Sequence, residues 1–169
     1  GFGQGFQPVC GFNYGAKLFK RVQEGFWFCV KFCTSVLLVA AVCGWIFSPN
    51  LIGIFLNTDP LVIEYGSQAL RLQALTFPLV GLITIANMML QTIGKTVKAS
   101  LLAMSRQFLF FVPVILTLPG FLGILGVQLS QPIADFCSFL LAVPLSISVL
   151  REMSHEQGQL EQLKITREN

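Results

Sequence analysis

The residue best suited to chemistry in this sequence is Asp135, because it carries an ionisable carboxyl group inside a long apolar segment. It belongs to a polar series formed by Gln128, Gln131, Asp135 and Ser138, whose spacing places them on one face of a helix. If that helix spans a membrane, the carboxylate lies about 14 Å deep, where a charge is costly without partners or water. Asp135 is therefore either a proton-accepting group beside a cavity or a hydrogen-bond hub between helices.

A second polar stripe, without charge, consists of Thr84, Asn87 and Gln91. These three residues also share one helix face. Amides and hydroxyls in an apolar helix either contact a polar substrate or hydrogen-bond to neighbouring helices, and the spacing alone leaves both uses open. The candidates for a substrate or ion pathway are Asn87, Gln91, Gln131 and Asp135.

Two arginines lie inside apolar segments. Arg71 follows Glu64 by seven residues on the same helix face, a pattern that favours an anchor at the membrane interface over a substrate contact. Arg106 lies seven residues inside the next segment, from which its long side chain can extend to the headgroups or cap carbonyls of an adjacent helix.

Other patterns carry no chemistry. Cys29 and Cys33 are four residues apart, but His155 is the only histidine and lies far along the chain, so packing is favoured over a metal site. The five cysteines are odd in number and imply no disulfide framework. The glycines of residues 1–5 lack the strand and the lysine of a phosphate-binding loop. No catalytic triad or carboxylate pair is present, so we expect neither an enzyme nor a cofactor.

Composition decides the class of protein. The chain is 54% hydrophobic and 11% charged, which suits lipid better than water as solvent. In lipid the backbone must satisfy its own hydrogen bonds, and apolar runs of about 20 residues favour helices over a barrel. The basic residues flank these runs and do not alternate with stacking aromatics, which argues against nucleic-acid binding. We predict four complete spans, at residues 26–47, 69–93, 99–118 and 126–150.

The segments between the spans also have expected structures. The first residues of the stretch 1–15 are predicted to be the inner end of a helix whose body is missing, and residues 16–25 an amphipathic surface connection. Trp27 and Trp45 mark the two interfaces of the first span. Residues 48–50 break that helix, residues 51–58 form the connection at the other side, and Asp59 caps the next helix. Gly94 is expected to end the second span and Pro119-Gly120 the third.

Charge alternates between the connections and sets an expected topology. The basic connections and the tail contain Lys17, Lys20, Arg21, Lys95, Lys98, Arg151, Lys164 and Arg167. Asp59 and Glu64 are expected on the opposite side of the membrane, where the connection has no basic residue. Basic loops remain in the cytoplasm, so we predict a cytoplasmic C-terminus, with residues 1–150 in the membrane and residues 151–169 as a polar tail. The chain begins with Gly1 and is expected to be the C-terminal piece of a longer protein.

One run of sequence resembles a known family. Residues 3–17, followed by Arg21-Val22, resemble a motif of bacterial multidrug and toxic compound extrusion (MATE) transporters. The resemblance continues at Ala69-Leu70-Arg71 with Pro78, Gln91–Gly94, Ser105–Gln107 with Pro113, and Gln131–Asp135. The motif residues that we expect to be structural are Gln7, Pro8, Gly11, Asn13, Tyr14 and Gly15. Among them, Gly11, Tyr14 and Gly15 are expected to form a turn.

The resemblance implies an all-α integral membrane protein with two six-helix bundles. This chain would supply the end of helix eight and helices nine to twelve, and its partners would be membrane lipids and the missing N-terminal bundle. By resemblance it would export drugs or organic cations in exchange for Na⁺ or H⁺ across a bacterial inner membrane by alternating access. The family often has an acidic residue on helix ten, whereas residues 69–93 here have none and offer Asn87 and Gln91.

Two rival functions fit the same residues. A flippase for lipid-linked precursors, with similar architecture, should have a more strongly cationic cavity than the few buried basic residues here provide. A small four-span membrane protein could instead serve only in assembly, without transport. The sequence upstream of Gly1 would separate this second rival from a transporter fragment.

Overall fold

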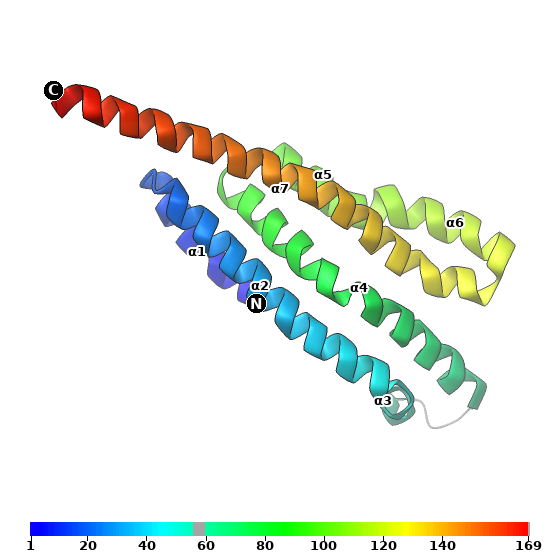
Figure 1. Ribbon diagram of the computed structural model, residues 1–169. Coiled ribbons are helices and arrows are strands. Elements are labelled where there is room, and N and C mark those ends of the chain that lie inside the picture. Colours follow the sequence, from blue (N-terminus) through cyan, green and yellow to red (C-terminus); the bar gives the residue numbers. More distant parts are fainter. Residues whose placement is uncertain (56–59, 169) are drawn as a thin grey trace.

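The computed structural model describes residues 1–55 and 60–168, and every long element in that part of the chain is helical. The elements in chain order are α1 (Phe2–Gly15), α2 (Phe19–Ile46), α3 (Ser48–Phe55), α4 (Pro60–Thr92), α5 (Thr96–Met104), the π-helix η1 (Ser105–Phe110), α6 (Phe111–Leu122) and α7 (Ile124–Glu168). In Figure 1, α4 lies between α2 on one side and α7 on the other, and α6 lies along α7. The α1–α2 connection, the α4–α5 connection and the C-terminus share one end of this bundle.

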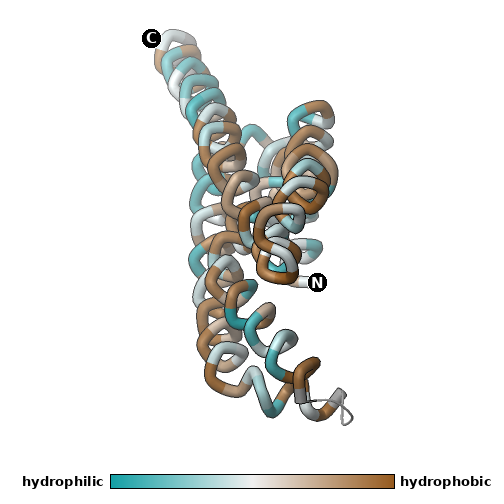
Figure 2. Tube along the Cα trace, turned by 90° about the vertical axis from the view of Figure 1, so that its right-hand side faces the viewer, coloured by the Kyte–Doolittle hydropathy of each residue, from teal (hydrophilic) through white to brown (hydrophobic). Residues whose placement is uncertain are grey.

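Four helical segments are long and apolar enough to cross a membrane. They are Phe19–Ile46, Leu61–Thr92, Thr96–Leu122 and Ile124–Leu163. Figure 2 shows apolar residues along most of the bundle, with polar ones concentrated in the projecting C-terminal helix. The prediction of an all-helical membrane protein with four complete spans is confirmed.

The amphipathic connection before the first span is shorter than predicted. Only residues 16–18 separate α1 from α2, and Lys17 reverses the chain with a φ of 57°. Residues 19–25 form the first two turns of α2. The reason is packing: Phe19 and Val22 are buried in the same core as the apolar body of the helix. A separate interfacial segment would have left both side chains in contact with headgroups.

The connection after α2 is also more regular than expected. The helix does end at Ile46, but Ser48–Phe55 then forms the short helix α3. Pro49 is tolerated there because it occupies the first turn, where a backbone N–H has no helical partner. The predicted cap, Asp59, lies outside the described residues, and α4 begins at the next position, Pro60.

The helices that contain the third and fourth spans continue past the predicted ends of those spans. Pro119 lies inside α6, which continues to Leu122 and ends at Gly123, whose φ is 58°. A proline within a membrane helix is accommodated by local adjustment, so it is a weaker stop signal than in water. The polar tail after Leu150 continues α7 as one helix to Glu168.

The start of this tail contacts one end of α2 and the α4–α5 connection. Met153 is buried in the main core, although it follows the predicted membrane boundary. Gln23 donates a hydrogen bond to the carbonyl oxygen of Leu150 at 2.9 Å, and Lys95 pairs with Glu152. These contacts connect α2 and the α4–α5 connection to α7, which brings the predicted basic connections together at one end of the bundle.

Candidate functional site

Asp135 lies at the centre of a hydrogen-bonded cluster between α4, η1 and α7. Its side chain is fully buried. Oδ1 accepts from Nε of Arg106 at 2.6 Å and from Nε2 of Gln131 at 3.0 Å. Oδ2 accepts from Nε2 of Gln73 at 2.8 Å and from Oγ1 of Thr76 at 3.4 Å. We call these five residues the Asp135 cluster.

Most acceptor positions of the carboxylate are occupied. An ionised carboxylate offers about four lone-pair positions, and three side-chain N–H groups donate to three of them. The Thr76 hydroxyl lies near the fourth, but it is closer to the carbonyl oxygen of Gln73, at 3.0 Å. One donor is the Arg106 guanidinium, which balances the charge that makes a buried carboxylate costly. In this conformation the carboxylate therefore joins α4, η1 and α7 through its donors.

The prediction for Arg106 is wrong. Its Nε does not extend to the headgroups or cap a carbonyl but pairs with Asp135. Arg106 lies in the π-helix η1, and Pro113 follows shortly after, without an N–H for the carbonyl of Leu109. A π turn contains more residues per turn than an α-helix and re-aims the side chains that it carries, and such turns recur at functional sites.

A small polar cavity adjoins the cluster through Arg106. It has a volume of about 210 Å³, and its polar lining residues are Thr84, Asn87, Arg106 and Gln107. The Oδ1 atom of Asn87 is buried and has no hydrogen-bond partner within the described part of the chain. A buried acceptor without a donor is uncommon and destabilising. The residues that line the cavity thus include Asn87, with one unsatisfied oxygen, and the cationic Arg106.

The helical fold is shared with known transporters. The sequence model of the MatE family matches residues 1–117. The chain belongs to the MATE family. Among solved structures, the MATE multidrug transporter DinF-BH in complex with rhodamine 6G is 34% identical, with a TM-score of 0.79 over 85% of this chain. No curated protein matches the sequence.

Two further MATE structures show the same fold at lower identity. An inward-facing multidrug resistance transporter gives a TM-score of 0.82 at 17% identity over 89% of the chain. An outward-facing one gives 0.84 at 17% identity over 90%. The chain spans about a third of the length of these transporters, 35% of each. It is thus a multi-pass membrane protein of a transporter family and not an enzyme.

The MATE chain brings together only some of the predicted pathway residues. Gln131 and Asp135 are in direct contact, whereas Asn87 is connected to them only through Arg106 in the cavity wall. Gln91 is exposed one turn farther along and does not line that cavity. Of the polar face on α7, Gln128 donates to the carbonyl oxygen of Tyr65 at 3.0 Å. That face therefore packs against α4, as its polarity required.

Two members of the cluster were not predicted, although the sequence contained a signal for them. Gln73 and Thr76 lie eleven residues before Thr84 and Asn87, which is about three helical turns. They extend the stripe that we recognised on α4 toward the other end of the helix. Apolar residues interrupt this extension, so the polar pattern is not continuous along the helix. Its contact with Asp135 depends on how α4 and α7 pack.

The family motif near the N-terminus is helical. Gly11, Tyr14 and Gly15 belong to the last turns of α1, so the expected turn at these residues is wrong, and the reversal follows at residues 16–18. Gly11 packs closely on α4, since a Cβ there would lie 3.2 Å from Cγ2 of Thr92. The side-chain amide of Asn13 donates to the carbonyl oxygen of Val9 at 2.8 Å. Gln7 and Pro8 lie earlier in the same helix.

Arg71 contacts the α2–α3 junction. Its Nε donates to Oγ of Ser48 at 2.9 Å, and its guanidinium carbon lies 5.8 Å from the centre of the Trp45 ring. Within the described residues Arg71 makes no ion pair with Glu64. These contacts fit the predicted anchoring role and not a substrate contact.

Proposed function

We propose that this MATE chain forms part of the C-terminal bundle of a secondary active efflux transporter that exports organic cations in exchange for Na⁺ or H⁺. Family membership supports transport. The solved relative in complex with rhodamine 6G supports a drug-like ligand, because its sequence is more similar to this chain than those of the inward-facing and outward-facing structures. The mechanism is alternating access between two bundles, of which this chain contributes to one.

The observation that carries the proposal is the similarity of this unit to both transport states. Its fold matches an inward-facing and an outward-facing relative with nearly equal TM-scores, 0.82 and 0.84. A segment that keeps its internal packing in both states acts as a rigid body, and rocking of rigid bodies is how such transporters change access. The Asp135 cluster supplies a cause for this rigidity, because it links α4, η1 and α7.

We assign the pathway contact to Asn87. Its free Oδ1 can accept a hydrogen bond from an organic ammonium or contribute an oxygen to Na⁺, which takes oxygen ligands as other hard cations do. Thr84 lines the same cavity and offers a second neutral oxygen. Neutral ligands suit a substrate that must be released, since each lacks the strong attraction of a carboxylate.

We further propose that the end of the bundle with the α1–α2 and α4–α5 connections faces the cytoplasm of a bacterial cell. Lys17, Lys20, Lys95 and Lys98 lie in or beside these connections. The K/R excess in short loops retains them on the cytoplasmic side. The helix after Leu150 would then project into the cytoplasm from the inner membrane.

Rhodamine 6G efflux tests the function in the full transporter that contains this chain. Expressed in an efflux-deficient bacterium, it should lower dye accumulation, and a protonophore or sodium replacement should identify the driving ion. Asn87→Leu should reduce the efflux rate about tenfold, since it removes a hydrogen bond to a charged ligand. Asn50→Leu, at an exposed position on α3, is the matched control. Dye accumulation equal to that of the empty vector would refute organic-cation export.

A further inference from the structure

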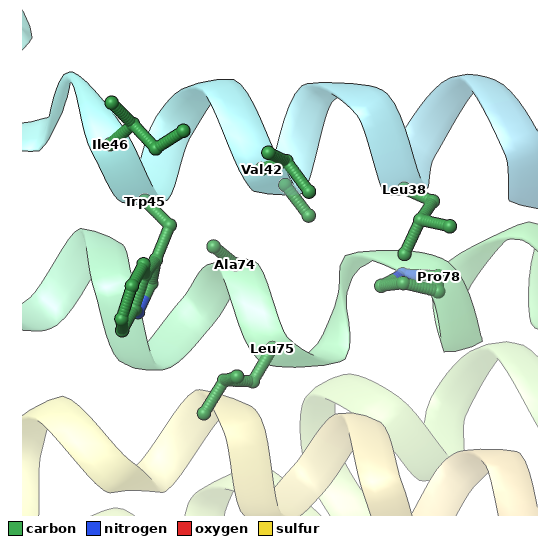
Figure 3. Close-up of a pocket in the computed structure, with 8 residues that line it drawn as sticks. Leu38, Val42, Trp45, Ile46, Ala74, Leu75 and Pro78 are labelled. Carbon is green, nitrogen blue, oxygen red and sulfur yellow. The ribbon is translucent and has the colours of Figure 1, made fainter.

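The helices α2 and α4 leave an open apolar groove near the end where α3 joins them. Figure 3 shows the residues that line it, among them Leu38, Val42 and Trp45 of α2 and Leu75 and Pro78 of α4. Its volume is about 530 Å³, and its lining is almost wholly apolar. Val42 and Leu75 are 52% and 69% exposed, so a large apolar surface has no protein partner among the described residues.

Most of the groove lies to one side of the line along which α1 would continue. Phe2 of α1 stacks on Phe32 of α2, with ring centres 4.7 Å apart. Val42 and Leu38 lie about 80–120° around α2 from Phe32, at about 100° per residue. Ile46, at about 40°, forms the edge of the groove nearest that line. An extension of α1 along its own axis would therefore pass beside this edge and leave Val42 and Leu38 uncovered.

A cation is fixed at one end of the groove. Arg71 lies one turn beyond Ala74 and Leu75, and its guanidinium is held over Trp45, which is itself a groove residue. Ser48 occupies only the Nε of Arg71, and no protein acceptor from the described residues occupies its terminal nitrogens. A guanidinium with free terminal N–H groups matches the geometry of a phosphate.

The position of Trp45 and Arg71 along their helices matches the level of lipid headgroups. Trp45 is the penultimate residue of the span Phe19–Ile46, and tryptophan is enriched at the level of lipid headgroups. An apolar groove below the headgroup level is complementary to an acyl chain, and a cation at that level is complementary to a phosphate. Glu64, two turns farther along the same face of α4, carries the opposite charge and disfavours lipids with several phosphates.

We propose that this groove is a binding site for one diacyl phospholipid with a single phosphate. One acyl chain lies between α2 and α4 beside Val42 and Leu75, and the phosphate accepts hydrogen bonds from the terminal nitrogens of Arg71. Binding would join the end of α2 to α4 through the lipid. The site is separate from the Asp135 cluster and from the Asn87 cavity, so it does not depend on the transport substrate.

Native mass spectrometry of the full transporter in detergent tests the site. The probes are a phosphatidylglycerol and a diacylglycerol with the same two acyl chains, which lacks the phosphate. The wild type should retain one phosphatidylglycerol and bind the diacylglycerol about tenfold more weakly, since the charge-assisted hydrogen bonds are absent. Arg71→Gln should weaken phosphatidylglycerol binding by a similar factor, whereas Arg151→Gln, at another exposed arginine, should not.

A second variant separates lipid binding from the contacts that Arg71 makes within the protein. Val42→Trp fills the groove and leaves Arg71 in place, so it should also lose the bound lipid. Val127→Trp, at a similarly exposed position on α7, is its control. If the wild type retains no phospholipid, another part of the protein covers the groove and the proposal is wrong. Equal retention by the wild type and Val42→Trp would also overturn it.

Discussion

Removal of the Asp135 carboxylate should be among the most damaging single substitutions in this chain. Asp135→Leu leaves the Arg106 guanidinium and the amides of Gln73 and Gln131 without their acceptor. Loss of one member of a buried ion pair costs about 3–5 kcal/mol. Arg106 is 30% exposed at its side chain and can regain some hydration, so we expect the lower end, about 3 kcal/mol.

The assay is unfolding of the purified protein in mixed micelles by titration with dodecyl sulfate, followed by tryptophan fluorescence. Trp27, the ninth residue of α2, and Trp45, its penultimate residue, report on the packing of this helix. The double variant Arg106→Leu/Asp135→Leu removes both charges, so it should recover about 2 kcal/mol relative to Asp135→Leu alone. A free energy of unfolding for Asp135→Leu within about 0.5 kcal/mol of the wild type would refute the ion pair.

The isosteric variant Asp135→Asn separates structure from ionisation. Its oxygen still accepts from Arg106, and the amide of Gln73 can rotate to present its oxygen to the new NH₂ group. We expect a loss of about 1 kcal/mol and efflux that is largely retained in the full transporter. A well-folded but inactive Asp135→Asn variant would instead show that this carboxyl group ionises during transport.

Three further outcomes follow from the same contacts. With the native thiols removed, Lys95→Cys should react with an impermeant thiol reagent only after the cells are opened, and labelling of intact cells would contradict the proposed topology. Gly126→Ala should destabilise the protein by about 1–3 kcal/mol, because its Cβ would lie 2.5 Å from the carbonyl oxygen of Leu118; Gly120→Ala, with open space around it, is the control in the same unfolding assay. The 169-residue chain expressed alone should give no dye efflux, because alternating access needs two bundles; efflux above the empty vector would show that this chain suffices.

The membrane fold could be predicted from the sequence because lipid constrains it so strongly. Apolar length determines the number of spans, and the backbone must be helical within them. The ends of the helices were less predictable. Pro119 and the polar residues after Leu150 resemble stop signals, yet α6 and α7 continue through them. Charge and proline mark where a helix leaves lipid or bends, which is not always where it ends.

Within the Asp135 cluster, only the contact between residues of the same helix was predictable from the sequence. Helical spacing placed Gln131 beside Asp135, and the pair is hydrogen-bonded. The other three donors come from elsewhere in the sequence, at separations of 29 to 62 residues. Whether Arg106 reaches α7 depends on η1, and no simple sequence pattern specifies a π turn. Contacts between residues so far apart in the sequence can therefore be identified only from the packed structure.

The contrast between two buried oxygens decides where the chemistry of this bundle should be sought. A carboxylate with three N–H donors must break hydrogen bonds before it can take up a new ligand in their place, and that cost opposes a site that alternates between states. The Oδ1 of Asn87 makes no such bond, so a ligand that donates to it gains an interaction without displacing one. We therefore expect two uses of buried polarity: Asp135 joins the helices, and Asn87 keeps an unpaired acceptor in the wall of the cavity that it lines.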